Sequence, residues 1–155
     1  MDDSKINAVP PIPGAVLRPS DRTRVIEHNG RAIVLMDFSR LKVSQDTLAV
    51  ILAARRFVAA QPKVQNLRTL VDVSESTYDY DVLEALKGLA AHNKPWVLAG
   101  AVVGLSPLRR LAVRIVCFFS GRKLASFKTL EEAKNWLAAQ EAPPSEVPET
   151  AGDAE

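Results

Sequence analysis

Two aspartates occupy matching places in the sequence, each followed two residues later by a serine. The first stretch reads Asp37-Phe38-Ser39, and the second reads Asp72-Val73-Ser74. Two carboxylates at one edge of a sheet can act as a general acid and base, or can bind Mg²⁺. Carboxylates at strand ends also cap turns by accepting backbone N–H groups, and we favour this role because no third ligand, histidine base or phosphate-binding loop lies near them.

Hydroxyl groups cluster directly after the second aspartate. Ser74, Ser76 and Thr77 precede a predicted helix, whose free N–H groups and partial positive charge would favour a phosphate. Phosphorylation at such a position is the chemistry of a regulatory switch. Three acidic residues in the same turn would repel the added charge: Glu75, Asp79 and Asp81. We therefore favour capping of the loop and helix by these hydroxyls over phosphorylation.

The remaining reactive side chains give little support for catalysis. His28 is placed at a predicted hairpin turn and His92 at a predicted helix end, where both fit surface or capping roles. The single cysteine, Cys117, lies in an apolar run and is expected to be a buried, inert thiol. Gly100 and Gly104 do not form a phosphate-binding motif. We expect a non-enzymatic protein with no cofactor and no metal ion.

The helix predicted over Pro107–Ser120 is the most unusual segment. Apolar residues occupy almost its whole circumference, so it needs cover on more than one side. The rest of the chain, a second protomer, another protein or an apolar ligand could each supply that cover. The candidate residues for a dimer surface or an apolar ligand site are Phe38, Tyr78, Tyr80, Leu111, Ile115, Phe118 and Phe119.

Basic residues accompany this helix. The net charge of +2 averages an acidic C-terminal end and a basic middle part. Arg109, Arg110 and Arg114 interrupt the apolar helix and are candidate contacts for an anionic partner. The other basic residues are scattered, without a recognised binding motif or interleaved stacking aromatics, so nucleic acid is the less favoured partner.

Strands and helices alternate along the part of the chain that carries these residues. Asn29-Gly30 favours a type I′ turn, which joins strands 23–28 and 31–39 in a hairpin. Three further strands are predicted over residues 66–74, 96–105 and 123–128. Helices between consecutive strands imply right-handed crossovers. The ββαβαβαβα order predicts an α/β fold, a small sandwich whose five-stranded sheet is mostly parallel, with the first strand antiparallel at one edge.

Helix ends are predicted from capping residues. Ser44 is the expected N-cap of the first helix, and Asp81 with Glu84 forms an acidic capping box for the second. Asn93 is expected to end that second helix in a left-handed conformation before Pro95. Thr129 begins the last helix with a full capping box.

The 155 residues suffice for one domain, which we place at residues 22–141. Residues 1–21 and 142–155 are rich in proline or acidic residues, and we expect both to be disordered tails. The N-terminus lacks the pattern of a secretory signal, and the longest apolar stretch, residues 96–108, is too short for a membrane span. A cytoplasmic location is expected.

Four short motifs suggest a known family. They are Leu70-Val71-Asp72-Val73-Ser74, His92-Asn93-Lys94-Pro95-Trp96, Ala101-Val102-Val103-Gly104 and Glu131-Glu132-Ala133-Lys134-Asn135-Trp136-Leu137. With the order of elements, they resemble the bacterial SpoIIAA-like family, which is related to STAS domains, the fold of anti-sigma factor antagonists. The resemblance implies sequentially ordered strands, and some relatives are compared with lipid-binding modules of the Sec14 type.

The resemblance also implies a site. In STAS domains an Asp-Ser-Ser-Gly motif carries the phosphoacceptor, which would place Asp72 and either Ser74 or Ser76 in those roles. The glycine of that motif is missing here, since Glu75 follows Ser74 and Thr77 follows Ser76.

Two hypotheses for function follow. The first is a non-enzymatic STAS-like regulatory or protein-interaction module, with a homodimer as one form, acting through residues 72–77 and the 107–120 helix. The second is a carrier or sensor of a small apolar or lipid-like ligand, in a pocket between that helix, Tyr78, Tyr80 and Phe38. A weak hydrolase using Asp37 and Asp72 ranks third.

Overall fold

The computed structural model describes residues 17–120 and 124–141, without the side chains of residues 112 and 115–120. Residues 1–16 of the predicted 1–21 tail and the whole predicted 142–155 tail lie outside the described residues, as does Gly121, the residue expected to end the 107–120 helix. The elements are η1 (Pro19–Arg22), β1 (Thr23–His28), β2 (Arg31–Asp37), α2 (Ser44–Ala59), β3 (Leu67–Asp72), α3 (Tyr80–Asn93), β4 (Val97–Val103), α4 (Pro107–Ser120), β5 (Leu124–Phe127) and α5 (Leu130–Ala139).

The strands form a five-stranded sheet in the order β1-β2-β3-β4-β5. β1 pairs with β2 in antiparallel fashion, and the pairs from β2 to β5 are parallel. Asn29 and Gly30 have φ angles of 52° and 78°, as a type I′ turn requires. The α/β class, the mostly parallel sheet and the antiparallel edge strand are therefore confirmed.

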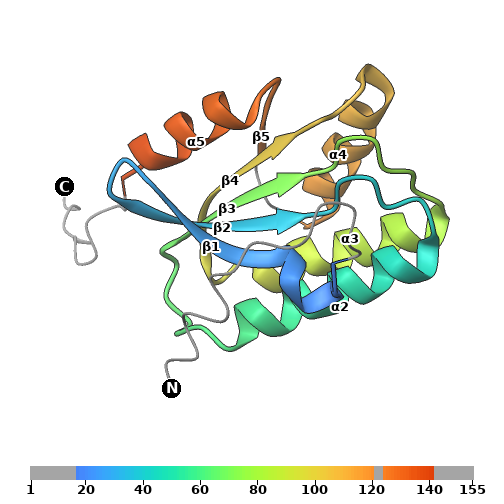
Figure 1. Ribbon diagram of the computed structural model, residues 1–155, viewed down its shortest axis with the longest axis horizontal. Helices are drawn as coiled ribbons and strands as arrows, with labels where there is room; N and C mark the ends of the chain where they lie inside the picture. The colour runs from blue at the N-terminus through green and yellow to red at the C-terminus, as the bar shows by residue number, and fades with distance from the viewer. Residues whose placement is uncertain (1–16, 121–123, 142–155) are drawn as a thin grey trace, which may run out of the picture.

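Helices cover both faces of the sheet. α2 and α3 lie on one face, α4 packs against α3, and α5 lies on the other face (Figure 1). Three right-handed crossovers between sequential parallel strands place α2, α3 and α4 on the same side. Alternate residues of β3 serve the two layers, because Val71 packs in the core under α2 and α3 whereas Leu70 packs in the core under α5.

Three predicted helix caps differ from the observed ones. The N-cap of α3 is Asp79, whose carboxylate accepts the backbone N–H of Val82 at 2.9 Å, so the Asp81 prediction is two residues late. Ser44 is the first residue of α2 and caps nothing, because its hydroxyl donates to Asp79 instead. Asn93 is still helical and does not adopt the predicted left-handed conformation, and Lys94 ends α3 in a right-handed one.

The predicted N-cap of α5 is confirmed. Thr129 is its N-cap, and the hydroxyl oxygen of Thr129 accepts the backbone N–H of Glu132 at 3.1 Å.

The ordered chain begins earlier than residue 22. Pro19–Arg22 form the short helix η1, which falls mostly within the predicted 1–21 tail. Proline is well suited to the first position of a helix because its φ angle is already restricted. Arg22 then donates hydrogen bonds to the carbonyl oxygens of Asp37 at 3.1 Å and Ser39 at 3.0 Å. These bonds attach η1 to the end of β2.

Candidate functional site

The two Asp-x-Ser stretches form matching turns at the carboxyl edge of the sheet. One carboxylate oxygen of Asp37 accepts the N–H of Ser39 at 2.9 Å and its hydroxyl at 2.5 Å. Asp72 accepts the same two groups of Ser74 at 3.0 and 2.7 Å. Asp37 and Asp72 are also paired in the β2–β3 register. Both carboxylates therefore cap turns, and within residues 17–120 and 124–141 no cluster of three acidic, histidine or cysteine residues is placed to bind a metal ion.

The parallel pairing continues beyond the strands into these turns. The N–H of Phe38 donates to the carbonyl oxygen of Asp72, and the N–H of Arg40 donates to that of Ser74, both at 2.8 Å. Arg40 and Glu75 follow the two serines with φ angles of 59° and 57°. The left-handed residues were not predicted, because neither is a glycine or an asparagine.

The predicted phosphoacceptors differ in accessibility. The side chain of Ser76 is fully buried and donates its hydroxyl to the carbonyl oxygen of Val73 at 2.7 Å, which speaks against phosphorylation of Ser76. Ser74 is partly buried, and its backbone packs closely against Gly104. A Cβ added to Gly104 would lie 2.6 Å from the backbone nitrogen of Ser74. Thr77 is exposed and donates to the carbonyl oxygen of Lys42 at 3.3 Å.

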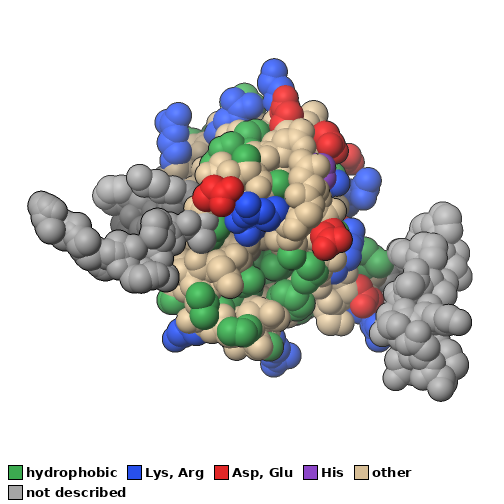
Figure 2. All heavy atoms as spheres, turned by 90° about the vertical axis from the view of Figure 1, so that its left-hand side faces the viewer, with side chains coloured by type: hydrophobic (Ala, Val, Ile, Leu, Met, Phe, Trp, Pro, Cys, Tyr) green, Lys and Arg blue, Asp and Glu red, His purple; other side chains and the backbone are tan. Residues whose placement is uncertain are grey.

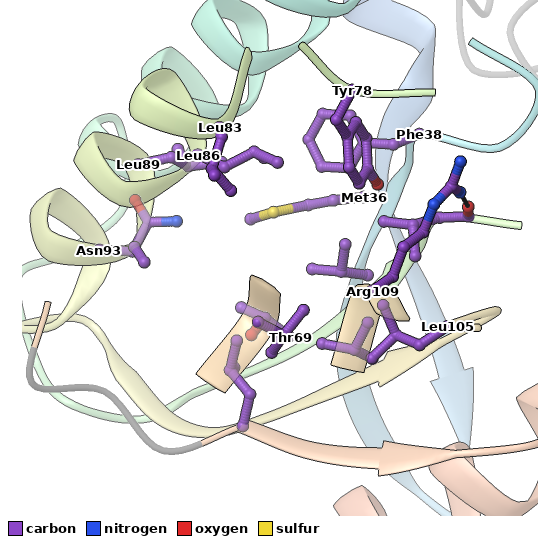
Figure 3. Close-up of a pocket in the computed structure, with 16 residues that line it drawn as sticks. Met36, Phe38, Thr69, Tyr78, Leu83, Leu86, Leu89, Asn93, Leu105 and Arg109 are labelled. Carbon is purple, nitrogen blue, oxygen red and sulfur yellow. Dashed lines mark hydrogen bonds between the residues drawn. The ribbon is translucent and has the colours of Figure 1, made fainter. Parts of the chain in front are cut away.

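An apolar pocket lies between the sheet, α3 and α4. It encloses about 690 Å³ of space between atoms, its open mouth included. Strands β2 to β5 supply its floor, α3 one wall, and Leu105, Arg109 and Val113 another (Figure 3). The lining residues are Met36, Phe38, Thr69, Val71, Val73, Tyr78, Leu83, Leu86, Leu89, Ala90, Asn93, Val102, Leu105, Arg109, Val113 and Leu124.

Two polar side chains lie together on one side of this pocket. The guanidinium of Arg109 stacks on the ring of Tyr78, with 5.1 Å between its central carbon and the ring centroid. One guanidinium nitrogen of Arg109 donates to the carbonyl oxygen of Val73 and to the hydroxyl of Ser76, each at 3.4 Å. The loop before α3 and the first turns of α4 therefore meet at the pocket.

The phenol of Tyr78 is buried, and its oxygen has no hydrogen-bond partner among the described residues. Burial raises the pKa of Tyr78 above its usual value of 10.0, while the nearby Ser76 hydroxyl and the Arg109 cation oppose that shift. The phenol therefore stays protonated at neutral pH.

A polar group also lies at the other end of the pocket. Asn93, at the end of α3, has only 1% of its surface exposed. Its side-chain oxygen is paired with Nδ1 of His92 at 2.8 Å, and its amide nitrogen points into the pocket (Figure 3). The sequence predicts Asn93 as the end of a helix and not as a residue of a binding site.

The structure brings together part of the predicted site. Phe38, Tyr78 and Arg109 line the pocket, whereas Tyr80 is 72% exposed and Leu111 is 52% exposed, both outside it. Arg110 and Arg114 are exposed and also lie outside the pocket. The side chains of Ile115, Phe118 and Phe119 lie outside the described part of the chain.

Sequence reasoning missed the pocket residues contributed by α3. Leu83, Leu86 and Leu89 recur at the spacing of one helix face, which indicates burial, and all three line the pocket. An apolar stripe looks the same in sequence whether it meets a packed core or a cavity, so no signal separated the two.

The amino edge of the strands offers a contrasting surface. Figure 2 shows basic and acidic side chains interspersed there, with no continuous stripe of one sign. Mixed charges of this kind do not support a nucleic-acid interface on that face. No helix in the described part of the chain is both long enough and apolar enough to cross a bilayer.

Comparisons with known proteins bear on the fold. A crystal structure of an uncharacterised protein of the DUF3478 family from Shewanella loihica PV-4, described as having a SpoIIAA-like fold, superposes with a TM-score of 0.57. The match covers 74% of this chain and 91% of that chain. The chain has a SpoIIAA-like fold.

The SpoIIAA-like fold confirms the resemblance drawn from the sequence motifs. Sequence identity to the Shewanella protein is 17%, a level at which the likeness concerns the fold alone. No protein-family model matches the chain, and no curated protein matches it either. Function must therefore be argued from the site itself.

Proposed function

We propose that this SpoIIAA-like protein binds a small apolar or lipid-like molecule in the pocket between the sheet, α3 and α4, as a carrier or sensor and not as an enzyme. The apolar pocket carries this proposal. It lies between the sheet and two helices, and its lining is almost wholly apolar. Thirteen of the described lining residues are apolar or aromatic, and polar groups occur at only a few points, as in small-molecule sites.

The arrangement of the catalytic candidates supports binding rather than catalysis. Asp37 and Asp72 are engaged by their own serines, and neither lines the pocket. The comparison of some relatives with Sec14-type modules, which the sequence resemblance implies, is consistent with a lipid-like ligand.

Phenylnaphthylamine, a neutral apolar dye that fluoresces when it leaves water, tests the proposal. The full chain should enhance its fluorescence saturably. Val113→Trp, which fills the pocket from α4, should abolish the saturable part. Leu111→Trp is the matched control because Leu111 lies on the same helix outside the pocket, and it should bind as the wild type does.

Native mass spectrometry of the protein purified from cells supplies a second readout. The proposal expects an adduct that Val113→Trp lacks and Leu111→Trp retains. A clean unliganded mass in every preparation, together with no saturable dye signal, would refute it.

A protein-interaction module is the second candidate. Large apolar side chains are exposed near the starts of α3 and α4, where Tyr80 is 72%, Leu108 is 77% and Leu111 is 52% exposed. α3 and α4 both follow parallel strands, so these residues belong to the same edge of the sheet. Light scattering of the full chain tests for a homodimer, which Leu111→Asp should dissociate while leaving dye binding in place. A monomer at every concentration would remove the homodimer form.

A further inference from the structure

Arg109 is the one charged side chain among the described residues that line the pocket. No carboxylate of the described residues lies within ion-pair distance of it. Arginine has five N–H donors in a planar fork that fits a carboxylate. Within the described part of the chain, the two bonds that Arg109 makes, to Val73 and Ser76, are both 3.4 Å long and so lie beyond the usual range of about 2.7–3.2 Å. Among the described residues, one guanidinium nitrogen is engaged by long bonds and the other donors are left over.

Tyr78 provides a second unused donor at the same place. Its hydroxyl is buried without a hydrogen-bond partner in the described chain, and it points into the pocket (Figure 3). A phenol is protonated at neutral pH, and the raised pKa of Tyr78 keeps it so, which leaves the hydroxyl free to donate. The stacking of Arg109 on the Tyr78 ring keeps the cation next to this hydroxyl.

We infer that the ligand carries an anionic carboxylate head group, bound by the guanidinium of Arg109 and the hydroxyl of Tyr78, with an apolar chain extending into the pocket. This inference rests on the proposed function. One cation and one neutral donor match a singly charged group. A doubly charged phosphate would be less well neutralised, since the Asp72 carboxylate lies close enough to act on Tyr78. The site therefore selects a fatty-acid-like carboxylate over a neutral or cationic molecule of the same chain length.

Titration calorimetry with three ligands of equal chain length tests the selection: decanoate, decanol and decyltrimethylammonium. Wild-type protein should bind decanoate about tenfold or more tightly than decanol, because a hydrogen bond to a charged group contributes roughly that factor. The cationic ligand should bind most weakly of the three.

Variants at the head-group end separate this role from general charge effects. Arg109→Met should lower decanoate affinity by about tenfold or more while leaving decanol affinity unchanged. Arg109→Lys should restore part of the preference, and Tyr78→Phe should weaken decanoate binding without affecting decanol. Arg110→Met is the matched control, because Arg110 is the next residue on α4, is exposed and lies outside the pocket.

Each outcome decides between the claims. Equal binding of decanoate and decanol by the wild type would overturn the inference and leave the proposed function standing. A loss of decanoate affinity in Arg110→Met as large as in Arg109→Met would overturn it too, because the effect would then be long-range attraction. Failure of all three ligands and of phenylnaphthylamine to bind would instead refute the proposed function. Circular dichroism of each variant confirms that it is folded.

Discussion

Replacement of Gly104 by alanine should destabilise the protein strongly. Gly104 follows β4 with a φ angle of 90°, which residues with a side chain rarely adopt. An added Cβ would lie 2.6 Å from the backbone nitrogen of Ser74 and 2.7 Å from its Cα. Backbone atoms cannot rotate away as a side chain can, so the turn after β3 would have to shift.

The cost can be built from two contributions. A left-handed conformation costs an alanine about 1–2 kcal/mol relative to glycine. Overpacking at a tight contact costs about 1–3 kcal/mol more. Gly104→Ala should therefore lower the free energy of unfolding by about 2–5 kcal/mol, a large share of the roughly 5–15 kcal/mol that holds an ordinary domain folded.

Gly88→Ala is the matched control. Gly88 is exposed on α3, and apart from the backbone of its own helix turn no atom lies within 4 Å of the position its Cβ would take. Alanine is favoured over glycine inside a helix, so this variant should gain about 0.5–1 kcal/mol. The same chemical change should thus have opposite signs at the two positions.

Urea unfolding followed by circular dichroism measures both free energies. The slope of free energy against urea should be unchanged, so the midpoint alone reports stability. The double variant Gly104→Ala/Ser74→Gly also removes the Ser74 side chain. It should recover only part of the lost free energy of unfolding, because the contacts of the new Cβ with the Ser74 backbone remain. A Gly104→Ala variant as stable as the wild type would show that β4 and the Ser74 turn do not approach this closely.

Three further outcomes are expected. In a Tyr80→Phe variant Tyr78 is the one tyrosine left, and because its pKa is raised, its absorbance should titrate above pH 10.0. The contribution of Tyr78 to the free energy of unfolding should be fully present below pH 10.0 and should be lost as the pH rises beyond it, because the folded state keeps a proton that the unfolded chain loses. A midpoint at or below 10 would contradict this. Thr129→Ala should lower the free energy of unfolding in urea by about 1 kcal/mol, because the N–H of Glu132 loses its acceptor at the start of α5. An unchanged midpoint would refute that cap. Ser76→Ala should also cost about 1 kcal/mol, and intact-mass analysis should find no phosphate on Ser76, whose modification would contradict its burial.

Local signals predicted most of the fold. The Asn29-Gly30 turn and the N-cap at Thr129 depend on neighbouring residues alone, and both are confirmed. The N-cap of α3 was misplaced because Asp79 and Asp81 satisfy the same local rule, and only the tertiary structure chooses between them. Ser44 failed as a cap for a related reason, since its hydroxyl bonds to Asp79, 35 residues away.

The candidate site was predictable only in part. Phe38 and Tyr78 were expected at the pocket because they lie at strand and helix ends that parallel crossovers bring to one edge. Arg109 was expected to face an anionic partner, but its position beside Tyr78 depends on how α4 packs against α3. The cavity itself is a shortfall of packing volume, which a pattern of apolar residues does not encode.

The backbone bonds that join the two Asp-x-Ser turns have a consequence for how the pocket is assembled. Phe38 and Arg40 donate their amides across to the β3 turn, so these amides belong to the same cooperative unit as the sheet. Slow exchange of their hydrogens with solvent would follow, although both residues lie beyond the end of β2. The conformational entropy of ordering the Phe38 side of the pocket is then lost once, during folding. A ligand that binds later does not have to order these residues again.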